Sequence, residues 1–185
     1  MCLWIIKDWG GILTAKDSNT IELIDDFLTS NKPSYKRIAS SSKVGSFMYP
    51  QKYIIYDSRV AYSLNWIILS QNAGKKFFPI PNGRNSKMMA FDMNVLIRLK
   101  NINHYCPDDI NRLEKKRFIS QNDKDIYISE IDAYNELNKL IKEINSKLWA
   151  DDRANNLYYT EMLLFSIADK EIYYDIVKKV KLEIA

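Results

Sequence analysis

The amino-acid sequence predicts a mainly α-helical domain. Apolar residues recur three and four positions apart over most of the chain, which is the spacing that gathers them on one face of a helix. The chain has 185 residues and is 46% hydrophobic, so it can bury a sizeable core. We therefore expect one compact helical domain over residues 1–185, built from about seven or eight helices.

The first predicted helix spans about residues 20–30. Asn19 is a capping residue with Glu22 three positions further on, and this pattern is typical of a helix start. Apolar residues then follow at helical spacing, namely Ile21, Ile24, Phe27 and Leu28.

A second apolar run extends over residues 35–48, after a junction at which Lys32-Pro33 disfavours helix. The polar triplet Ser40-Ser41-Ser42 interrupts this run. We interpret the triplet as a turn between two short helices.

The middle of the chain contains a clear helix and a clear loop. Residues 58–70 carry an apolar face, with Asp57 at the N-cap position. Residues 71–87 are rich in Gly, Pro and Asn, which predicts a loop, and residues 89–99 predict a further helix. A subdomain break is expected near residues 101–125.

The last third of the chain has the most regular pattern. Residues 131–148 predict a long amphipathic helix, and residues 157–168 predict another. Glu161 begins an apolar run in the second of these and is interpreted as a charge on the helix surface. Residues 172–184 are compatible with a terminal helix or a strand.

The composition limits the kinds of chemistry that this chain can perform. It contains two cysteines, Cys2 and Cys106, and one histidine, His104. A structural zinc site needs about four Cys or His ligands and an iron–sulfur cluster usually needs four cysteines, so neither site is expected. We predict no metal and no cofactor. The cysteines are expected to be free thiols, with one disulfide between them as the alternative.

The charge balance permits a polyanionic partner without requiring one. The net charge is +4 and the isoelectric point is about 8.9, from 27 basic and 23 acidic residues. The apolar N-terminal run is broken by Lys7 and Asp8, and no other window approaches the length of a membrane span. We expect a soluble, cytoplasmic and monomeric protein.

One lysine and one aspartate stand out as candidate catalytic residues. The segment Ser40-Ser41-Ser42-Lys43-Val44-Gly45 precedes Tyr56-Asp57-Ser58-Arg59-Val60, so Lys43 and Asp57 belong to different predicted helices. Cleavage of a glycosidic bond builds positive charge on the sugar, which a carboxylate stabilises, while an amine can capture the anomeric carbon. The alternative is that Asp57 is only a helix cap and Lys43 only a solvated lysine.

These two segments resemble the active-site region of helix-hairpin-helix DNA glycosylases. Ser41-Ser42-Lys43-Val44 resembles the hairpin that precedes the family's lysine, with serines in place of its glycines, and Ile55–Val60 resembles its aspartate at a helix start. The similarity covers about residues 36–69 and is closest to the bacterial 8-oxoguanine glycosylase-like proteins, some of which act against phage. It implies a compact fold like that glycosylase core, with Lys43 as the Schiff-base lysine and Asp57 as the catalytic aspartate.

The resemblance also implies that the partner is double-stranded DNA carrying a modified base. The base would be an oxidised purine or a glucosylated phage cytosine, and an abasic-site lyase activity could accompany its excision. The DNA-contacting candidates are Ser41, Ser42, Arg59, Lys36 and Arg37. Arg59 could equally pair with an acidic neighbour, and Lys36-Arg37 could be a solvated face.

A flipped base needs an aromatic or apolar slot. The aromatic candidates near these segments are Trp9, Tyr53, Tyr56 and Trp66. Core packing is the alternative role for each of these side chains.

Two other classes of function remain open at this point. One is a non-catalytic helical module that binds nucleic acid through Lys43, Arg59 and Lys75-Lys76. The other is an interaction protein that uses its long helices as a binding surface.

Overall fold

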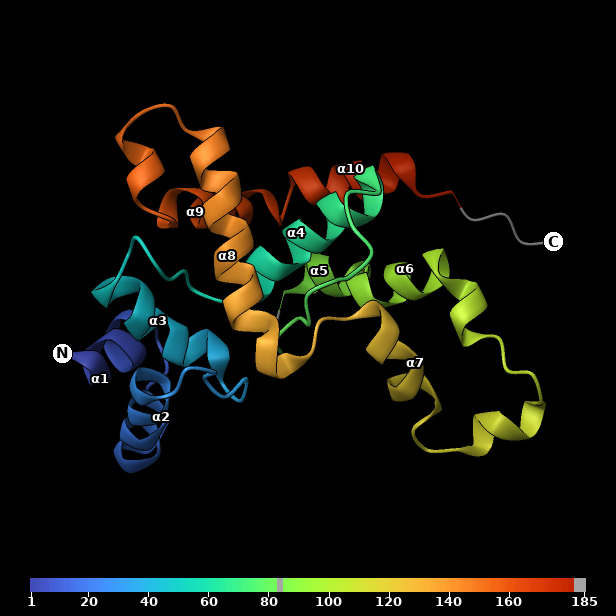
Figure 1. Ribbon diagram of the computed structural model, residues 1–185, viewed down its shortest axis with the longest axis horizontal. Helices are drawn as coiled ribbons and strands as arrows, with labels where there is room; N and C mark the ends of the chain where they lie inside the picture. Colours follow the sequence, from blue (N-terminus) through green and yellow to red (C-terminus); the bar gives the residue numbers. More distant parts are fainter. Residues whose placement is uncertain (83–84, 182–185) are drawn as a thin grey trace.

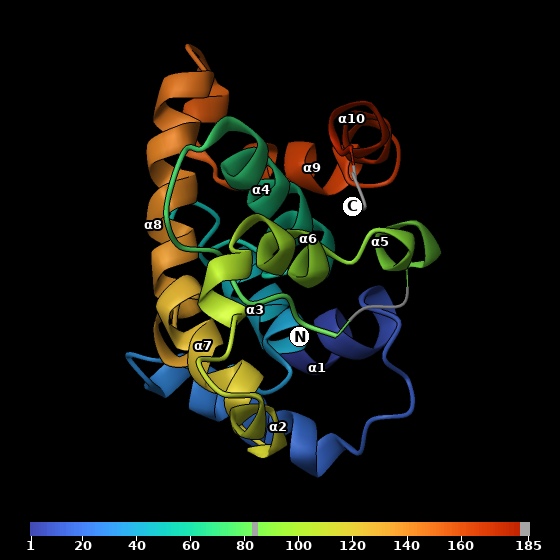
Figure 2. The same cartoon turned by 90° about the vertical axis from the view of Figure 1, so that its right-hand side faces the viewer.

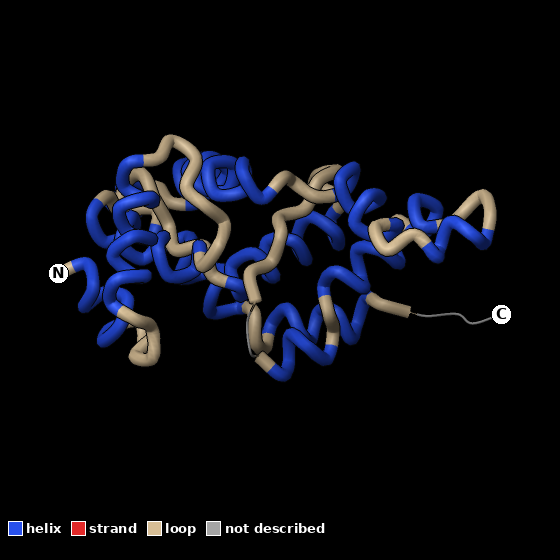
Figure 3. The backbone as a smooth tube through the Cα atoms, turned by 90° about the horizontal axis from the view of Figure 1, so that it is seen from below, coloured by secondary structure: helices blue, strands red, loops and turns tan. Residues whose placement is uncertain are grey.

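The computed structural model describes residues 1–82 and 85–181. Within these ranges the chain is mainly helical, as predicted, and the helices are joined by loops (Figure 3). Pairing of β type is limited, in the described ranges, to one parallel bridge between Phe77 and Tyr127. The helices are α1 (Cys2–Trp4), α2 (Asp17–Thr29), α3 (Ile38–Met48), α4 (Ser58–Gln71), α5 (Ser86–Ala90), α6 (Met93–Lys100), α7 (Phe118–Ile126), α8 (Glu130–Leu148), α9 (Tyr158–Ile167) and α10 (Glu171–Lys179).

Four short helical turns complete the described secondary structure. Residues Ile5–Trp9 continue α1 as a π-helical turn. The 3₁₀ turns are Ile102–Tyr105, Ile110–Glu114 and Asp152–Asn155.

Helix α4 forms the centre of the molecule. It packs against α6, α9 and α10, and α8 runs along the side of this group (Figures 1 and 2). Every residue of α4 from Val60 to Trp66 is buried, including the polar Ser63 and Asn65. The main core therefore surrounds α4.

A second, smaller apolar cluster lies at the N-terminal end of the chain. It consists of Ile6, Ile24 and Val44, which come from the π-helical turn, α2 and α3. Helix α3 also contributes Ile38 to the main core. Because α3 takes part in both clusters, it connects the N-terminal helices to the rest of the molecule.

The strongest local patterns predicted their helices well. The helices expected over 58–70, 131–148 and 157–168 are confirmed as α4, α8 and α9. Asp57 is the N-cap of α4, as predicted. The terminal segment is a helix over Glu171–Lys179, and residues 182–184 of that prediction lie outside the described residues.

The predicted turn at Ser40–Ser42 is wrong. Helix α3 continues through all three serines, and the connection between α2 and α3 instead occupies residues 30–37. Ser42 Oγ donates to the carbonyl of Ile38 at 2.6 Å, a bond that a serine forms within a continuous helix. The three serine side chains are buried, so packing overrides their preference for turns.

Two other boundaries differ from the predictions. Helix α2 begins at Asp17 with Lys16 as its N-cap, so Asn19 is not the capping residue. The helix expected over 89–99 is divided into α5 and α6, because the Asp92 side chain accepts hydrogen bonds from the first amides of α6. The sequence predicts a subdomain break near residues 101–125, and this segment projects from the main body at the right of Figure 1.

Candidate nucleobase pocket

Lys43 and Asp57 line the same pocket, which has a volume of about 700 Å³. Lys43 is supplied by the middle of α3 and Asp57 by the start of α4, while α9 forms the opposite wall. The remaining lining residues are Trp9, Gly10, Ser46, Phe47, Pro50, Ile55, Tyr158, Glu161, Met162 and Phe165. We refer to this space as the Lys43–Asp57 pocket.

The amine of Lys43 is held against the N-terminal segment. Its Nζ donates to the carbonyl oxygen of Gly10 at 3.4 Å and lies 5.9 Å from the ring centre of Trp9. Burial lowers the pKa of Lys43 below its ordinary value, because desolvation disfavours the charged form, and the negative charge of Asp57 partly opposes this shift. The setting therefore makes the Lys43 amine easier to deprotonate than a fully solvated lysine.

Gly10 lets the amine approach the backbone this closely. A Cβ atom at position 10 would lie 2.8 Å from Lys43 Nζ and 2.5 Å from the carbonyl oxygen of Ile6. Both separations are shorter than real Cβ contacts, so a larger residue would displace the lysine or the π-helical turn.

Asp57 is fixed by its role as a helix cap. Its Oδ1 accepts a hydrogen bond from the backbone N–H of Arg59 at 2.8 Å, which satisfies one of the free amides at the start of α4. The cap fixes the carboxylate at the pocket wall, so the structural role and a chemical role are compatible in one side chain.

A single serine connects the two elements that carry Lys43 and Asp57. Ser42 Oγ accepts a hydrogen bond from the backbone N–H of Tyr56 at 2.9 Å, while it donates to the carbonyl of Ile38. Ser42 precedes Lys43 in the chain and Tyr56 precedes Asp57. This buried bond therefore sets the distance between α3 and the start of α4 next to the pocket.

Glu161 is a second carboxyl group in the pocket, and the sequence interpretation of it as a surface charge is wrong. The residue is only 6% exposed, and its Oε2 accepts a hydrogen bond from the backbone N–H of Ile55 at 3.1 Å. Burial raises the pKa of Glu161 to about 7; the hydrogen bond from Ile55 opposes this rise and the charge of Asp57 adds to it. The only available sequence signal was an acidic residue inside an apolar helical run.

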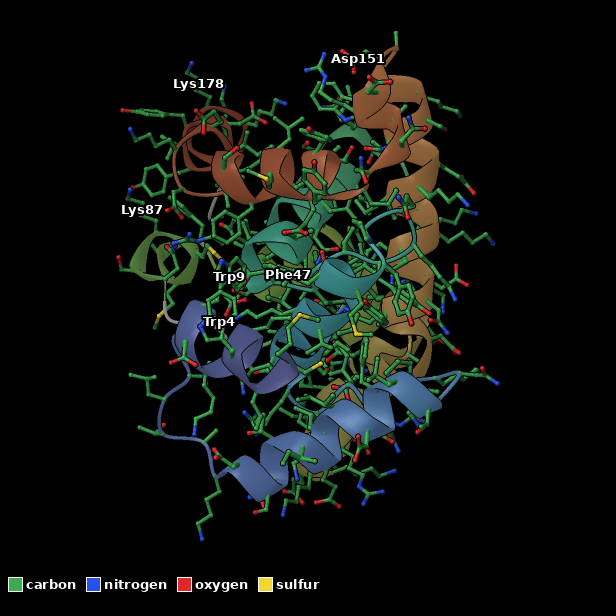
Figure 4. All side chains as sticks on the ribbon, turned by 90° about the vertical axis from the view of Figure 1, so that its left-hand side faces the viewer. Trp4, Trp9, Phe47, Lys87, Asp151 and Lys178 are labelled. Carbon is green, nitrogen blue, oxygen red and sulfur yellow. The ribbon has the colours of Figure 1, made fainter. Side chains whose placement is uncertain are left out.

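Aromatic side chains form the outer part of the pocket. Trp9 and Phe47 pack edge to face with their ring centres 4.8 Å apart, and each is about half exposed, at 50% and 48%. Figure 4 shows them together between the N-terminal helices and α9. Phe165 lies on the α9 side of the same pocket. A flat, apolar molecule could be covered by these rings.

Ser41 and Ser42 do not face solvent, contrary to the DNA-contacting role expected for them. They are 1% and 0% exposed and lie inside α3, so no phosphate can reach them without unfolding the helix. Lys36 and Arg37 lie in the connection before α3, where Lys36 is exposed and Arg37 adopts a left-handed conformation with φ of 59°. They do not line the Lys43–Asp57 pocket.

Arg59 lies beside the pocket and already has partners in the protein. Its guanidinium is 3.4 Å from the carboxylate of Asp169 and stacks over the ring of Phe165 at 4.6 Å. Of the two roles left open by the sequence, the pairing with an acidic neighbour is observed.

Three of the four predicted base-pocket aromatics belong elsewhere. Tyr56 and Trp66 are core residues; the Tyr56 hydroxyl donates to the carbonyl of Pro79, and the Trp66 indole donates to Asp175. Tyr53 lines a different pocket of about 620 Å³, between α2 and α8. Of the four, Trp9 is the one that lines the Lys43–Asp57 pocket.

The described residues offer no alternative centre built on a metal or a disulfide. Cys2 and Cys106 are free thiols, and no group of three or more His, Cys, Asp or Glu side chains in the described ranges is arranged to hold a metal ion. None of the described helices combines the length and the apolar character needed to cross a bilayer.

No family model, curated protein or solved structure matches this chain.

Proposed function

We propose that this protein is a DNA glycosylase that excises a modified base, with Lys43 as the amine nucleophile and Asp57 as the stabilising carboxylate. The observation that carries the proposal is that Lys43 and Asp57, which lie on different helices, line one pocket. The pocket volume of about 700 Å³ lies within the range of about 300–1,000 Å³ that is typical of small-molecule sites. A base turned out of the duplex would enter beneath Trp9 and Phe47.

The proposed reaction uses each group where the structure holds it. As the bond from the base to the sugar breaks, its electron pair leaves with the base and positive charge develops on the sugar. The carboxylate of Asp57 stabilises that charge, and the lone pair of Lys43 Nζ forms a bond to the anomeric carbon. The lowered pKa of Lys43 supports this role, since a protonated amine has no lone pair to donate.

The experiment compares the wild-type protein with Lys43→Ala and Asp57→Asn on duplexes that carry different modified bases. The panel includes 8-oxoguanine and glucosylated hydroxymethylcytosine, and hot alkali after incubation reveals abasic sites. We expect alkali-labile sites with the wild-type protein and a loss of about 10²-fold or more in each variant. Borohydride reduction should trap the wild-type protein on DNA, while Lys43→Ala should not be trapped.

Two matched variants control for loss of charge alone. Lys52→Ala removes an exposed lysine that lies over the Tyr53 ring, outside the pocket. Asp92→Asn alters the N-cap of α6 in the same way that Asp57→Asn alters the N-cap of α4. Both should retain activity. Wild-type activity in Lys43→Ala or Asp57→Asn would refute the assigned roles, and salt-sensitive DNA binding without abasic sites would favour a non-catalytic module.

A further inference from the structure

Glu161 has a placement that the proposed roles of Lys43 and Asp57 do not explain. It projects from α9 into the Lys43–Asp57 pocket although it is almost fully buried. Its Oε2 is occupied by the N–H of Ile55, while its Oε1 has no hydrogen-bond partner in the part of the chain that the structure describes. Oε1 is therefore the oxygen that a molecule in the pocket could meet.

The groups around Glu161 favour a protonated carboxyl. Asp57, at the start of α4, brings a like charge. Tyr134, from α8, has a buried hydroxyl that donates to the carbonyl of Ile54; burial raises the pKa of this hydroxyl, and the charge of Glu161 adds to the rise. Lys43, from α3, and Tyr158, from α9 itself, complete the titratable groups on the pocket wall. When two neighbouring carboxyl groups share a site, the more buried one holds its proton and the other ionises.

We infer that Glu161 is the proton donor to the departing base, so that the substrate is a base that must be protonated in order to leave. This inference rests on the proposed glycosylase function and adds a third residue to it. Because Oε2 accepts from Ile55, the transferable proton is on Oε1. Asp57 remains free to act as the anion.

The step balances without any further reactant. The O–H bond at Glu161 Oε1 breaks, and its proton forms a bond with a ring nitrogen or carbonyl oxygen of the base. The bond from the base to the sugar breaks with its electron pair going to the base, which leaves as a neutral molecule. The Lys43 amine captures the sugar carbon, and Glu161 is left as a carboxylate.

The inference defines the chemical class of the substrate. A neutral base that carries a basic ring nitrogen or a carbonyl oxygen can accept the proton, and its departure is accelerated when it does. A base that is already cationic through alkylation of the ring gains nothing from Glu161, since it leaves as a neutral molecule without protonation. The preferred substrate is therefore a neutral modified base.

The test compares wild-type protein, Glu161→Gln and the control Glu143→Gln, which alters an exposed glutamate on α8. Glutamine retains an oxygen for the Ile55 N–H but cannot donate a proton of this acidity. Single-turnover excision is measured between about pH 5.5 and 9.5 on the best duplex of the panel. The second readout is borohydride trapping on DNA that already contains an abasic site, from which no base has to leave.

We expect Glu161→Gln to excise the base about 10²–10⁴-fold more slowly and to be trapped on abasic DNA at the wild-type rate. The wild-type pH profile should bend near pH 7, where Glu161 loses its proton, and the bend should be missing in Glu161→Gln. Glu143→Gln should match the wild-type protein in every measurement.

Excision by Glu161→Gln at the wild-type rate, or a wild-type profile without the bend, would overturn the inference and leave the glycosylase proposal intact. An equal loss of excision and of abasic trapping would also overturn it, because Glu161 would then act only through the structure of the pocket. A wild-type protein that excises no base would refute the glycosylase proposal itself.

Discussion

Replacement of Ser42 by alanine tests whether one buried hydroxyl holds the two halves of the site together. Ser42→Ala removes the acceptor of the Tyr56 N–H, which is buried away from solvent. A buried donor left without a partner costs about 1–3 kcal/mol. The carbonyl of Ile38 can still accept from the helix backbone, so the expected loss is about 2 kcal/mol of the free energy of unfolding.

For a chain of this length, about 2 kcal/mol corresponds to a decrease in melting temperature of about 4–8 °C. Ser41→Ala is a matched control, since Ser41 is also buried in α3 but its hydroxyl, among the described residues, reaches only the Ile38 carbonyl, at 3.5 Å. The control should change the free energy of unfolding by no more than about 0.5 kcal/mol. Urea and thermal unfolding followed by circular dichroism measure both variants.

The same substitution should also affect the site. Loss of the Ser42 bond frees the segment before Asp57 to move relative to Lys43, so excision should slow even at temperatures at which the variant is fully folded. Equal stability of Ser42→Ala and Ser41→Ala would refute the reasoning, because it would show that the Tyr56 amide finds another partner at no cost.

Three further predictions concern the pocket residues. Burial raises the pKa of Glu161 from 4.5 to about 7, so the folded state binds more protons than the unfolded state between these pH values, and the free energy of unfolding falls as pH rises through them. At pH 8, Glu161→Gln should therefore have a higher urea midpoint than wild type and a free energy of unfolding larger by up to about 3 kcal/mol. A variant of equal or lower stability would contradict this. Asp57→Ala should lose about 1 kcal/mol of helix capping while Asp57→Asn loses a few tenths, and equal urea midpoints for the two variants would contradict the capping role. Gly10→Ala should destabilise the fold by about 1–3 kcal/mol and slow borohydride trapping, since its Cβ would displace the Lys43 amine; unchanged trapping would show that the Gly10 contact does not position the lysine.

Patterns that are local in the chain were sufficient to predict most helices. The continuous apolar face of α4, its aspartate cap and the long amphipathic α8 were all visible in the sequence. The prediction failed at Ser40–Ser42, where three turn-forming residues lie in a helix. Their burial and the bond from Tyr56 to Ser42 stabilise the helix there, and neither can be derived from serine propensity.

The sequence by itself determined that the chain forms helices and that Lys43 and Asp57 lie on two successive ones, because helical spacing and capping depend on residues within a few positions of each other. Only the tertiary structure decided that these side chains share a pocket and that Glu161 joins them. The contact between Ile55 and Glu161 joins residues 106 positions apart, and no local pattern encodes a partner at that distance. The burial that raises the pKa of Glu161 and lowers that of Lys43 arises only when α3, α4 and α9 pack together.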